Sequence, residues 1–370
     1  MDLRVPTMPA ASPEHDQIAY VLAGGEQPPV LRVASADGQV LAEFSGARAP
    51  QWVGRDLWFL LPVKGVAQVV RWREGAQTVV TAAGVDVLCF RAQGDEVLVA
   101  VVCGSDVRDI AAAQPVSAAR TRVFEGGYVR RWDRWTSAER IAIWRQQVGG
   151  SAHRVTPPDF DDTPTRPFPT SDAFDFAPDG GVLFVSQPVE GARWRTARTV
   201  WWAPVSGGCV ALLEREALIT SVRTVQGGNA IAVGVTDRPG HDSDLVRLEW
   251  SPWRPGAMAW TPWTSDWDRG VWSWAPSAEG AWLTADDAGQ RRAFFLPWRA
   301  SLPQPVPGAS SVTQLAVGRG GALVVASGLG QPPHLAWLTE GGRRPLGPVT
   351  TVGATPAVRV VAAGWRGEPG

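Results

Sequence analysis

One short phrase recurs seven times along this chain: a turn with glycine or acidic residues, followed by a run of three or four apolar residues. The first residue of each run serves as a marker, and the markers are Ile18, Leu57, Val97, Val182, Ile231, Trp282 and Leu323. Subtraction of neighbouring markers gives steps of 39, 40, 85, 49, 51 and 41 residues. Five of these six steps lie near the period of a four-stranded propeller blade, and the long step requires an insertion or an unseen repeat.

A second strand signal follows each phrase. These runs are Val30–Val33, Val69–Trp72, Ile141–Trp144, Val200–Trp202, Leu245–Leu248, Ala293–Leu296 and Leu335–Leu338. Several units then close with a short strand that ends in threonine, as at Thr78–Thr81 and His153–Thr156. Short strands separated by Gly, Pro, Asp and Ser are typical of antiparallel meanders. The sequence therefore predicts an all-β fold, a seven-bladed β-propeller of WD40-like repeats.

The aromatic content fits this prediction. A blade cannot bury both faces of its sheet, but stacked blades cover one another at about 10 Å. Twenty Trp, against two Tyr and eleven Phe, provide large apolar side chains for the spaces between blades. An eighth blade is the alternative, because Ile141 lies 44 residues after Val97 and 41 before Val182. We prefer seven blades, with Ile141 in the second half of a long third blade.

Composition excludes several classes of partner. The net charge is -1 and no basic stripe stands out, which argues against nucleic acid. No apolar run is long enough to span a membrane, and residues 1–6 show no signal peptide, so we expect a cytoplasmic protein. Cys89, Cys103 and Cys209 lack metal-binding spacing and are expected to be reduced thiols. The oligomeric state is not predicted.

No motif for bond cleavage is present. The chain has no Gly-x-Ser-x-Gly nucleophile elbow and no phosphate-binding loop, and its four histidines fall in four different repeats. We therefore expect no catalytic residues, no metal site and no cofactor. The chain is predicted to be inactive alone.

Two polar clusters are candidate substrate sites. The first lies in residues 128–135 and contributes Arg130, Arg131, Trp132 and Asp133. The guanidinium groups of its arginines suit a carboxylate. The second lies in residues 238–247 and contributes His241, Asp242, Asp244 and Arg247. The plainer interpretations are a strand with a solvated polar face for the first and a pairing across a turn for the second.

Two further clusters carry open alternatives. Residues 266–269 and the pair Asp286-Asp287 form an acidic cluster, which indicates either turn residues that bind backbone amides or a calcium site without a recognisable ligand loop. The second cluster, of tryptophans, indicates either a sugar-binding platform or, as we prefer, core between blades. Its members are Trp250, Trp253, Trp260, Trp263 and Trp267.

An ordered series of segments resembles the propeller of the prolyl oligopeptidase (S9) family of serine peptidases, especially its acylaminoacyl-peptidase and dipeptidyl-peptidase-five-like branch. Residues 173–180 resemble the family's Phe-Ser-Pro-Asp-Gly blade opening, and residues 129–135 its Arg-His-Trp-Asp-x-Trp segment. Residues 153–161, 239–248, 266–271 and 284–289 match further segments in the family's order. Three positions depart from the pattern: Arg131 replaces His, His241 replaces Tyr and Asp242 replaces Glu.

The resemblance implies a division of the chain and a function. Residues 1–11 would form an N-terminal arm, residues 12–350 the propeller, and residues 351–370 a linker strand toward an absent α/β-hydrolase domain. The propeller would be the non-catalytic, substrate-gating half of a serine peptidase, with peptides and an α/β-hydrolase domain or subunit as partners. The alternatives are a stand-alone TolB-like propeller that acts as a binding scaffold, and a Trp-lined carbohydrate binder.

Overall fold

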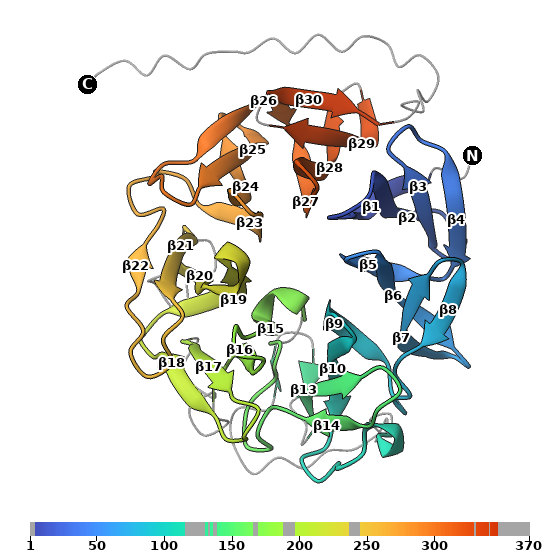
Figure 1. Cartoon of the computed structure of the whole chain (residues 1–370), viewed down its shortest axis with the longest axis vertical. Coiled ribbons are helices and arrows are strands. Elements are labelled where there is room, and N and C mark those ends of the chain that lie inside the picture. The colour runs from blue at the N-terminus through green and yellow to red at the C-terminus, as the bar shows by residue number, and fades with distance from the viewer. Residues whose placement is uncertain are drawn as a thin grey trace.

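The structure, a computed structural model, describes residues 4–114, 130–131, 134–135, 139–165, 169–187, 197–236, 245–328, 331–339 and 341–346. Within these ranges the chain forms seven four-stranded antiparallel sheets and one two-stranded hairpin. The helical elements among the described residues are three short 3-10 turns, η1 (Ile110–Ala112), η2 (Ser171–Ala173) and η3 (Gln226–Gly228). The seven sheets stand around a common centre as the blades of a propeller (Figure 1).

Each blade is a meander of four strands that pair in chain order. Blades 1 and 2 contain β1 (Val5–Ala11), β2 (Gln17–Ala23), β3 (Val30–Ser35) and β4 (Val40–Ser45), then β5 (Arg48–Val53), β6 (Asp56–Val63), β7 (Val66–Arg73) and β8 (Ala76–Val79). Blades 3 and 4 contain β9 (Val87–Gln93), β10 (Glu96–Cys103), β13 (Arg140–Gln147) and β14 (Ala152–Arg154), then β15 (Phe174–Phe176), β16 (Val182–Ser186), β17 (Thr199–Ala203) and β18 (Val210–Leu213).

The remaining three blades follow the same plan. Blade 5 contains β19 (Leu218–Val225), β20 (Ala230–Thr236), β21 (Arg247–Pro252) and β22 (Thr261–Pro262), and blade 6 contains β23 (Val271–Pro276), β24 (Gly280–Asp287), β25 (Gln290–Pro297) and β26 (Gln304–Ser310). Blade 7 contains β27 (Val312–Gly318), β28 (Gly321–Gly328), β29 (Gln331–Thr339) and β30 (Gly342–Pro345). The first strand of each blade lies next to the centre (Figure 1).

The long step between markers is an insertion within blade 3, so the prediction of seven blades is confirmed. Ile141 lies in β13, opposite Val102 of β10, and therefore belongs to the third strand of that blade. The insertion between β10 and β13 contains η1 and the hairpin of β11 (Arg130–Arg131) and β12 (Arg134–Trp135). All seven markers fall in the second strand of a blade. Residues 5–11, part of the predicted arm, form β1 and pair with β2 in the first blade.

Apolar side chains fill the spaces between blades, as the tryptophan content indicated. A separate buried cluster joins each of the seven pairs of neighbouring blades. Trp58 of blade 2 and Trp144 of blade 3 are fully buried in one of them. Between blades 1 and 2, the rings of Phe44 and Phe59 stack with centroids 4.7 Å apart. Burial of both faces of each sheet thus requires the neighbouring blade.

The ring closes through side chains and loops, without exchange of strands among the described residues. Each of the seven sheets takes its four strands from one continuous stretch of the chain, so none combines strands from the two ends. Blades 7 and 1 meet in a buried cluster that includes Leu323 and Val325 on one side and Ile18 on the other. Gln314 of β27 donates a hydrogen bond from Nε2 to Thr7 Oγ1 of β1 over 2.8 Å. The contact between first and last blade is therefore noncovalent throughout the described residues.

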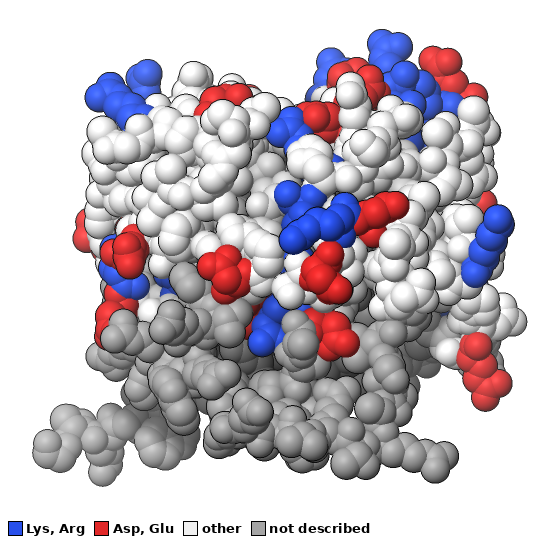
Figure 2. Space-filling model, turned by 90° about the horizontal axis from the view of Figure 1, so that it is seen from below, with Lys and Arg blue, Asp and Glu red and all other residues white. Residues whose placement is uncertain are grey.

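On the part of the face in Figure 2 that is not grey, most of the surface is uncharged, and basic and acidic side chains lie next to one another in small groups. Several such pairs in the molecule are short ion pairs, including Arg145 with Glu96 at 2.5 Å. Cys89 and Cys103 are buried and carry free thiols, and Cys209 is half-buried. Among the described residues, no helix has the length and apolar character needed to cross a membrane.

Candidate functional site

The residues predicted to contact substrate are placed only in part. Trp132, Asp133, His241, Asp242 and Asp244 lie outside the described residues. Arg130 and Arg131 form β11, opposite Trp135 and Arg134 in the two-stranded hairpin of the blade 3 insertion. The role of this cluster in peptide binding stays a prediction.

Arg247 lies among the described residues, and its side chain contacts a residue of its own blade. It is the first residue of β21 in blade 5, and its Nη1 donates a hydrogen bond to the carbonyl oxygen of Ser265. This bond joins the start of the third strand to the loop that follows the fourth strand of the same blade. Arg247 therefore stabilises the outer part of blade 5, and its predicted contact with substrate stays a prediction.

A group of charged side chains lies at the inner strands of blades 3, 4 and 5. Arg91 is in β9, Arg223 in β19, and both guanidinium groups donate to the carbonyl oxygen of Ser171 in η2, at 2.8 and 3.0 Å. Arg223 also forms an ion pair with Asp172. Arg91 lies 3.9 Å from both Asp172 and Asp175. Three neighbouring blades are thus joined by polar contacts beside the centre of the ring (Figure 1).

Burial and charge determine how this inner cluster can act. Burial and the nearby Arg223 charge lower the pKa of Arg91 to about 10, although Asp175 and Asp172 oppose the shift. Arg91 therefore stays protonated near neutral pH. The side chain of Arg223 is 8% exposed, whereas that of Asp172 is 54% exposed. The cluster balances two cations with two carboxylates, and the carboxylate of Asp172 is its most accessible charge.

Sequence reasoning missed this cluster. Arg91, Asp175 and Arg223 each lie two or three residues before the start of a repeated phrase, at Gln93, Ala177 and Gln226. A charged residue at that position of an otherwise apolar segment was the available signal. The pairing itself could not be read from the chain, because the partners come from three blades.

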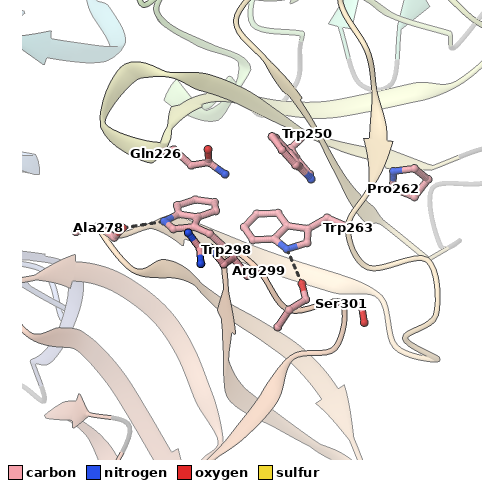
Figure 3. Close-up of a pocket in the computed structure, with 9 residues that line it drawn as sticks. Gln226, Trp250, Pro262, Trp263, Ala278, Trp298, Arg299 and Ser301 are labelled. Atoms are coloured by element: carbon pink, nitrogen blue, oxygen red, sulfur yellow. Dashed lines mark hydrogen bonds between the residues drawn. The ribbon is translucent and has the colours of Figure 1, made fainter.

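An aromatic cavity lies between blades 5 and 6. It has a volume of about 760 Å³ and is lined by Gln226, Trp250, Pro262, Trp263, Ala278, Trp298, Arg299, Ala300 and Ser301 (Figure 3). The rings of Trp263 and Trp298 stack with centroids 4.8 Å apart and an interplanar angle of 20°. Trp298 was not among the tryptophans singled out from the sequence, because it follows a strand of blade 6 and not of blade 5.

The predicted tryptophan cluster does not form one platform. Trp253 packs edge-on against Trp202 of blade 4, with ring centroids 5.6 Å apart. Trp260 donates from Nε1 to the carbonyl oxygen of Leu212, also in blade 4, at 3.1 Å. Trp263 and Trp267 are buried between blades 5 and 6. Most of the cluster is therefore inter-blade core, as preferred, and only Trp250 and Trp263 line the cavity.

In the acidic cluster, the carboxylates of Asp286 and Asp287 form ion pairs with arginines. Arg269 donates to Asp287 Oδ1 from Nε and Nη2, at 3.1 and 2.8 Å, and Arg292 lies 3.0 Å from the same carboxylate. Arg291 pairs with Asp286 at 2.9 Å and stacks over the Trp272 ring. In the part of the chain that the structure describes, no group of three or more His, Cys, Asp or Glu residues could hold a metal ion.

Solved structures of peptidases share this fold. The acylaminoacyl peptidase of Pyrococcus horikoshii matches with a TM-score of 0.68 and 12% identity, over 94% of this chain and 53% of that chain. A prolyl endopeptidase structure matches with a TM-score of 0.59 and 15% identity, over 95% of this chain and 49% of that chain. This chain thus spans about half the length of those enzymes. No family model and no curated protein sequence matches it.

A propeller solved by itself is also similar. The β-propeller domain of the Trilobed protease from Pyrococcus furiosus, described as having an open velcro topology, matches with a TM-score of 0.63 and 11% identity. The match covers 94% of this chain and 99% of that domain. At these identities the likeness concerns the fold alone.

Proposed function

We propose that this chain is the non-catalytic propeller of an oligopeptidase-like serine peptidase, and that it controls which peptides reach an α/β-hydrolase active site. The observation that carries the proposal is the match of nearly the whole ring to about half of an acylaminoacyl peptidase. The ordered sequence resemblance from Arg130 to Gly289 supports it independently. A cytoplasmic location is part of the same proposal.

The geometry of a closed ring suits such a role. Seven blades joined by seven apolar clusters form a rigid wall around one axis. A hydrolase placed against one face of the ring would be reached along the axis or past its rim by a short peptide, whereas a folded protein is too wide. The ring would act by exclusion and needs no catalytic group of its own.

The inner cluster would add polar contacts along that route. Asp172 presents an accessible carboxylate at the ring centre, and Arg91 and Arg223 hold its turn in place through Ser171. A carboxylate accepts hydrogen bonds from peptide N–H groups and from a free amino terminus. The clusters of Arg130, Arg131, Trp132 and Asp133, and of His241, Asp242, Asp244 and Arg247, are proposed as further substrate contacts.

The test requires the chain alone and the chain together with a hydrolase. The coding sequence that follows residue 370 in the genome, or a neighbouring α/β-hydrolase gene, would be expressed with it, and cleavage of acyl-peptides and aminoacyl substrates measured. We expect no cleavage by this chain alone and cleavage by the combined protein. If the combined protein cleaves none of these substrates, the proposal is contradicted. A tight complex of this chain with a protein that is not a hydrolase would favour the scaffold alternative.

A further inference from the structure

The aromatic cavity between blades 5 and 6 has the composition of a small-ligand site. Its volume of about 760 Å³ falls within the range of about 300–1,000 Å³ that is typical of ligand pockets. Most of its lining comes from η3, β21, the end of β22 and the segment 298–301 that follows β25. The site thus depends on the packing of two blades and not on one loop.

Two fixed indole rings stack at the cavity, and Trp298 is the accessible one of the two. Trp263 is 4% exposed and stacks against the half-buried Trp298. Each ring is held by its own N–H group: Trp263 donates to the Ala300 carbonyl oxygen at 3.1 Å, and Trp298 to that of Ala278 at 2.8 Å. Trp250 faces the pair from across the cavity (Figure 3). A platform fixed in this way loses little conformational freedom when a ligand binds.

Polar side chains stand around this platform. Gln226 extends over the cavity from blade 5, while Arg299 and Ser301 come from blade 6 (Figure 3). Gln226 has a φ of 53°, a left-handed conformation that a non-glycine residue rarely adopts. Its carbonyl oxygen accepts hydrogen bonds from the Asn229 backbone N–H at 3.3 Å and from Asn229 Nδ2 at 3.0 Å.

We propose that this cavity binds a saccharide, with the apolar face of a pyranose ring on the indole of Trp298 and its oxygens on Gln226 and Arg299. An indole face attracts C–H groups, and an amide both donates to and accepts from hydroxyl groups. Arg299 donates only, and therefore suits a hydroxyl or a uronate carboxylate. Among the described residues the lining holds a single cation, which does not suit a polyphosphate, and its polar groups surround one platform, which suits a compact ring better than an extended peptide.

The saccharide site is independent of the proposed hydrolase partner, so it is tested with this chain alone. Binding of neutral and uronate-containing oligosaccharides, and of unrelated peptides as a comparison, would be measured by calorimetry and by saturation-transfer NMR at ligand concentrations up to about 10 mM. Variants W298F, Q226G and R299A alter the site. Matched controls are W272F, at an exposed tryptophan of the same blade, and R254A, at an exposed arginine outside the cavity.

We expect binding that W298F and Q226G weaken about tenfold or more, and that the two controls leave unchanged. Loss of binding in R299A for uronates alone assigns a carboxylate to Arg299, and an equal loss for neutral sugars assigns a hydroxyl. Thermal unfolding confirms that each variant is folded, and Q226G relieves the left-handed strain and so keeps the test valid if W298F unfolds. Absence of saccharide binding, binding of peptides only, or binding that no cavity variant weakens would overturn the inference.

Discussion

Single glycines at the start of second strands determine how closely the strands of a blade approach. A Cβ atom at Gly280 would lie 2.2 Å from the carbonyl oxygen of Leu296, and one at Gly321 would lie 2.2 Å from that of Leu338. At Gly181 it would lie 2.7 Å from the carbonyl oxygen of Ala203. In each blade the third strand is the obstacle: its backbone at Gly280 and Gly321, and both the Trp202 indole and the Ala203 backbone at Gly181. At Gly181, Gly280 and Gly321 the repeated phrase therefore needs glycine for close approach of the neighbouring strand.

Replacement of one of these glycines should destabilise its blade. We expect Gly280→Ala to lower the free energy of unfolding by about 1–3 kcal/mol, because the added methyl group must push back a backbone carbonyl. Gly150→Ala is the control, since its Cβ would meet no atom closer than 3.4 Å. Chemical denaturation measures both, and equal midpoints for the two variants would contradict this explanation of the repeat.

The acidic cluster of blade 6 should make stability depend on pH. Hydrogen bonds from Arg269, together with the charges of Arg269 and Arg292, lower the pKa of Asp287 below its ordinary value of 3.8. The unfolded chain therefore takes up this proton first as the pH falls. The resulting stabilisation is complete above the ordinary pKa and is lost as the pH falls through the lower, folded value.

Asp287→Asn should remove that part of the pH dependence. Below about pH 4 the wild type should lose more of its free energy of unfolding than the variant does. Asp286→Asn serves as control, because Asp286 is 65% exposed and pairs with Arg291 at the surface. Denaturation midpoints measured between about pH 3 and 6 give the slopes. Parallel curves for wild type and Asp287→Asn would show that this pair does not contribute.

At the scale of the strand, a threonine after the fourth strand hydrogen-bonds to the third strand in three of the blades. Thr81, Thr156 and Thr264 follow the fourth strand, and each Oγ1 accepts a hydrogen bond from a backbone N–H of the third strand. Their partners are Val69 at 2.9 Å, Ile143 at 3.1 Å and Leu248 at 2.9 Å. The recurring threonine seen in the sequence thus extends the pairing beyond the end of a short fourth strand.

Removal of one such hydroxyl leaves a buried donor without its partner. We expect Thr264→Val, which keeps the shape of the side chain, to cost about 1–3 kcal/mol of stability. Thr78→Val, at an exposed position of β8, should change stability little. The two variants are compared in thermal or chemical unfolding. A stability loss in Thr78→Val as large as in Thr264→Val would refute the proposed role of the hydroxyl.

The strands differ in how well the sequence predicts them. Second and third strands are largely buried and carry apolar runs, so the markers located the second strand in all seven blades. Fourth strands such as β8 are exposed along their length and have little apolar signal. First strands such as β5, Arg48–Val53, mix proline and polar residues with apolar ones. The inner cluster of Arg91 and Arg223 escaped prediction because its contacts cross between these weakly patterned strands.

At the scale of the whole molecule, blades 7 and 1 contain the last and first strands of the chain, and the seam between them is held by noncovalent contacts among the described residues. Gln314 joins β27 to Thr7 and to the Met8 N–H of β1. A similar glutamine, Gln51 of blade 2, exchanges hydrogen bonds with the Ala92 backbone of blade 3 at 3.0 and 3.1 Å. There the chain itself also connects the two blades. The number of blades follows from the repeat, but this closure does not, because β1 and β27 lie about 300 residues apart.

Loss of the two glutamines should therefore have different consequences. We expect Gln314→Ala to accelerate amide hydrogen exchange in β1 and β27, since opening the seam breaks only noncovalent contacts. Gln51→Ala removes a comparable pair of hydrogen bonds, and exchange in β5 and β9 should rise less. Exchange measured by mass spectrometry after proteolysis compares the two. Equal effects at both interfaces would show that the seam is no weaker than its neighbours.

Whether the ring limits access to a hydrolase is decided by the dependence of cleavage on substrate length. The proposed hydrolase partner would be assayed with and without the propeller, on peptides of increasing length and on a folded protein with an exposed cleavable loop. We expect the combined protein to cleave short peptides and spare the folded protein, whereas the hydrolase alone loses this discrimination. Cleavage of long and folded substrates at the same rate with and without the propeller would show that the ring does not act as a gate.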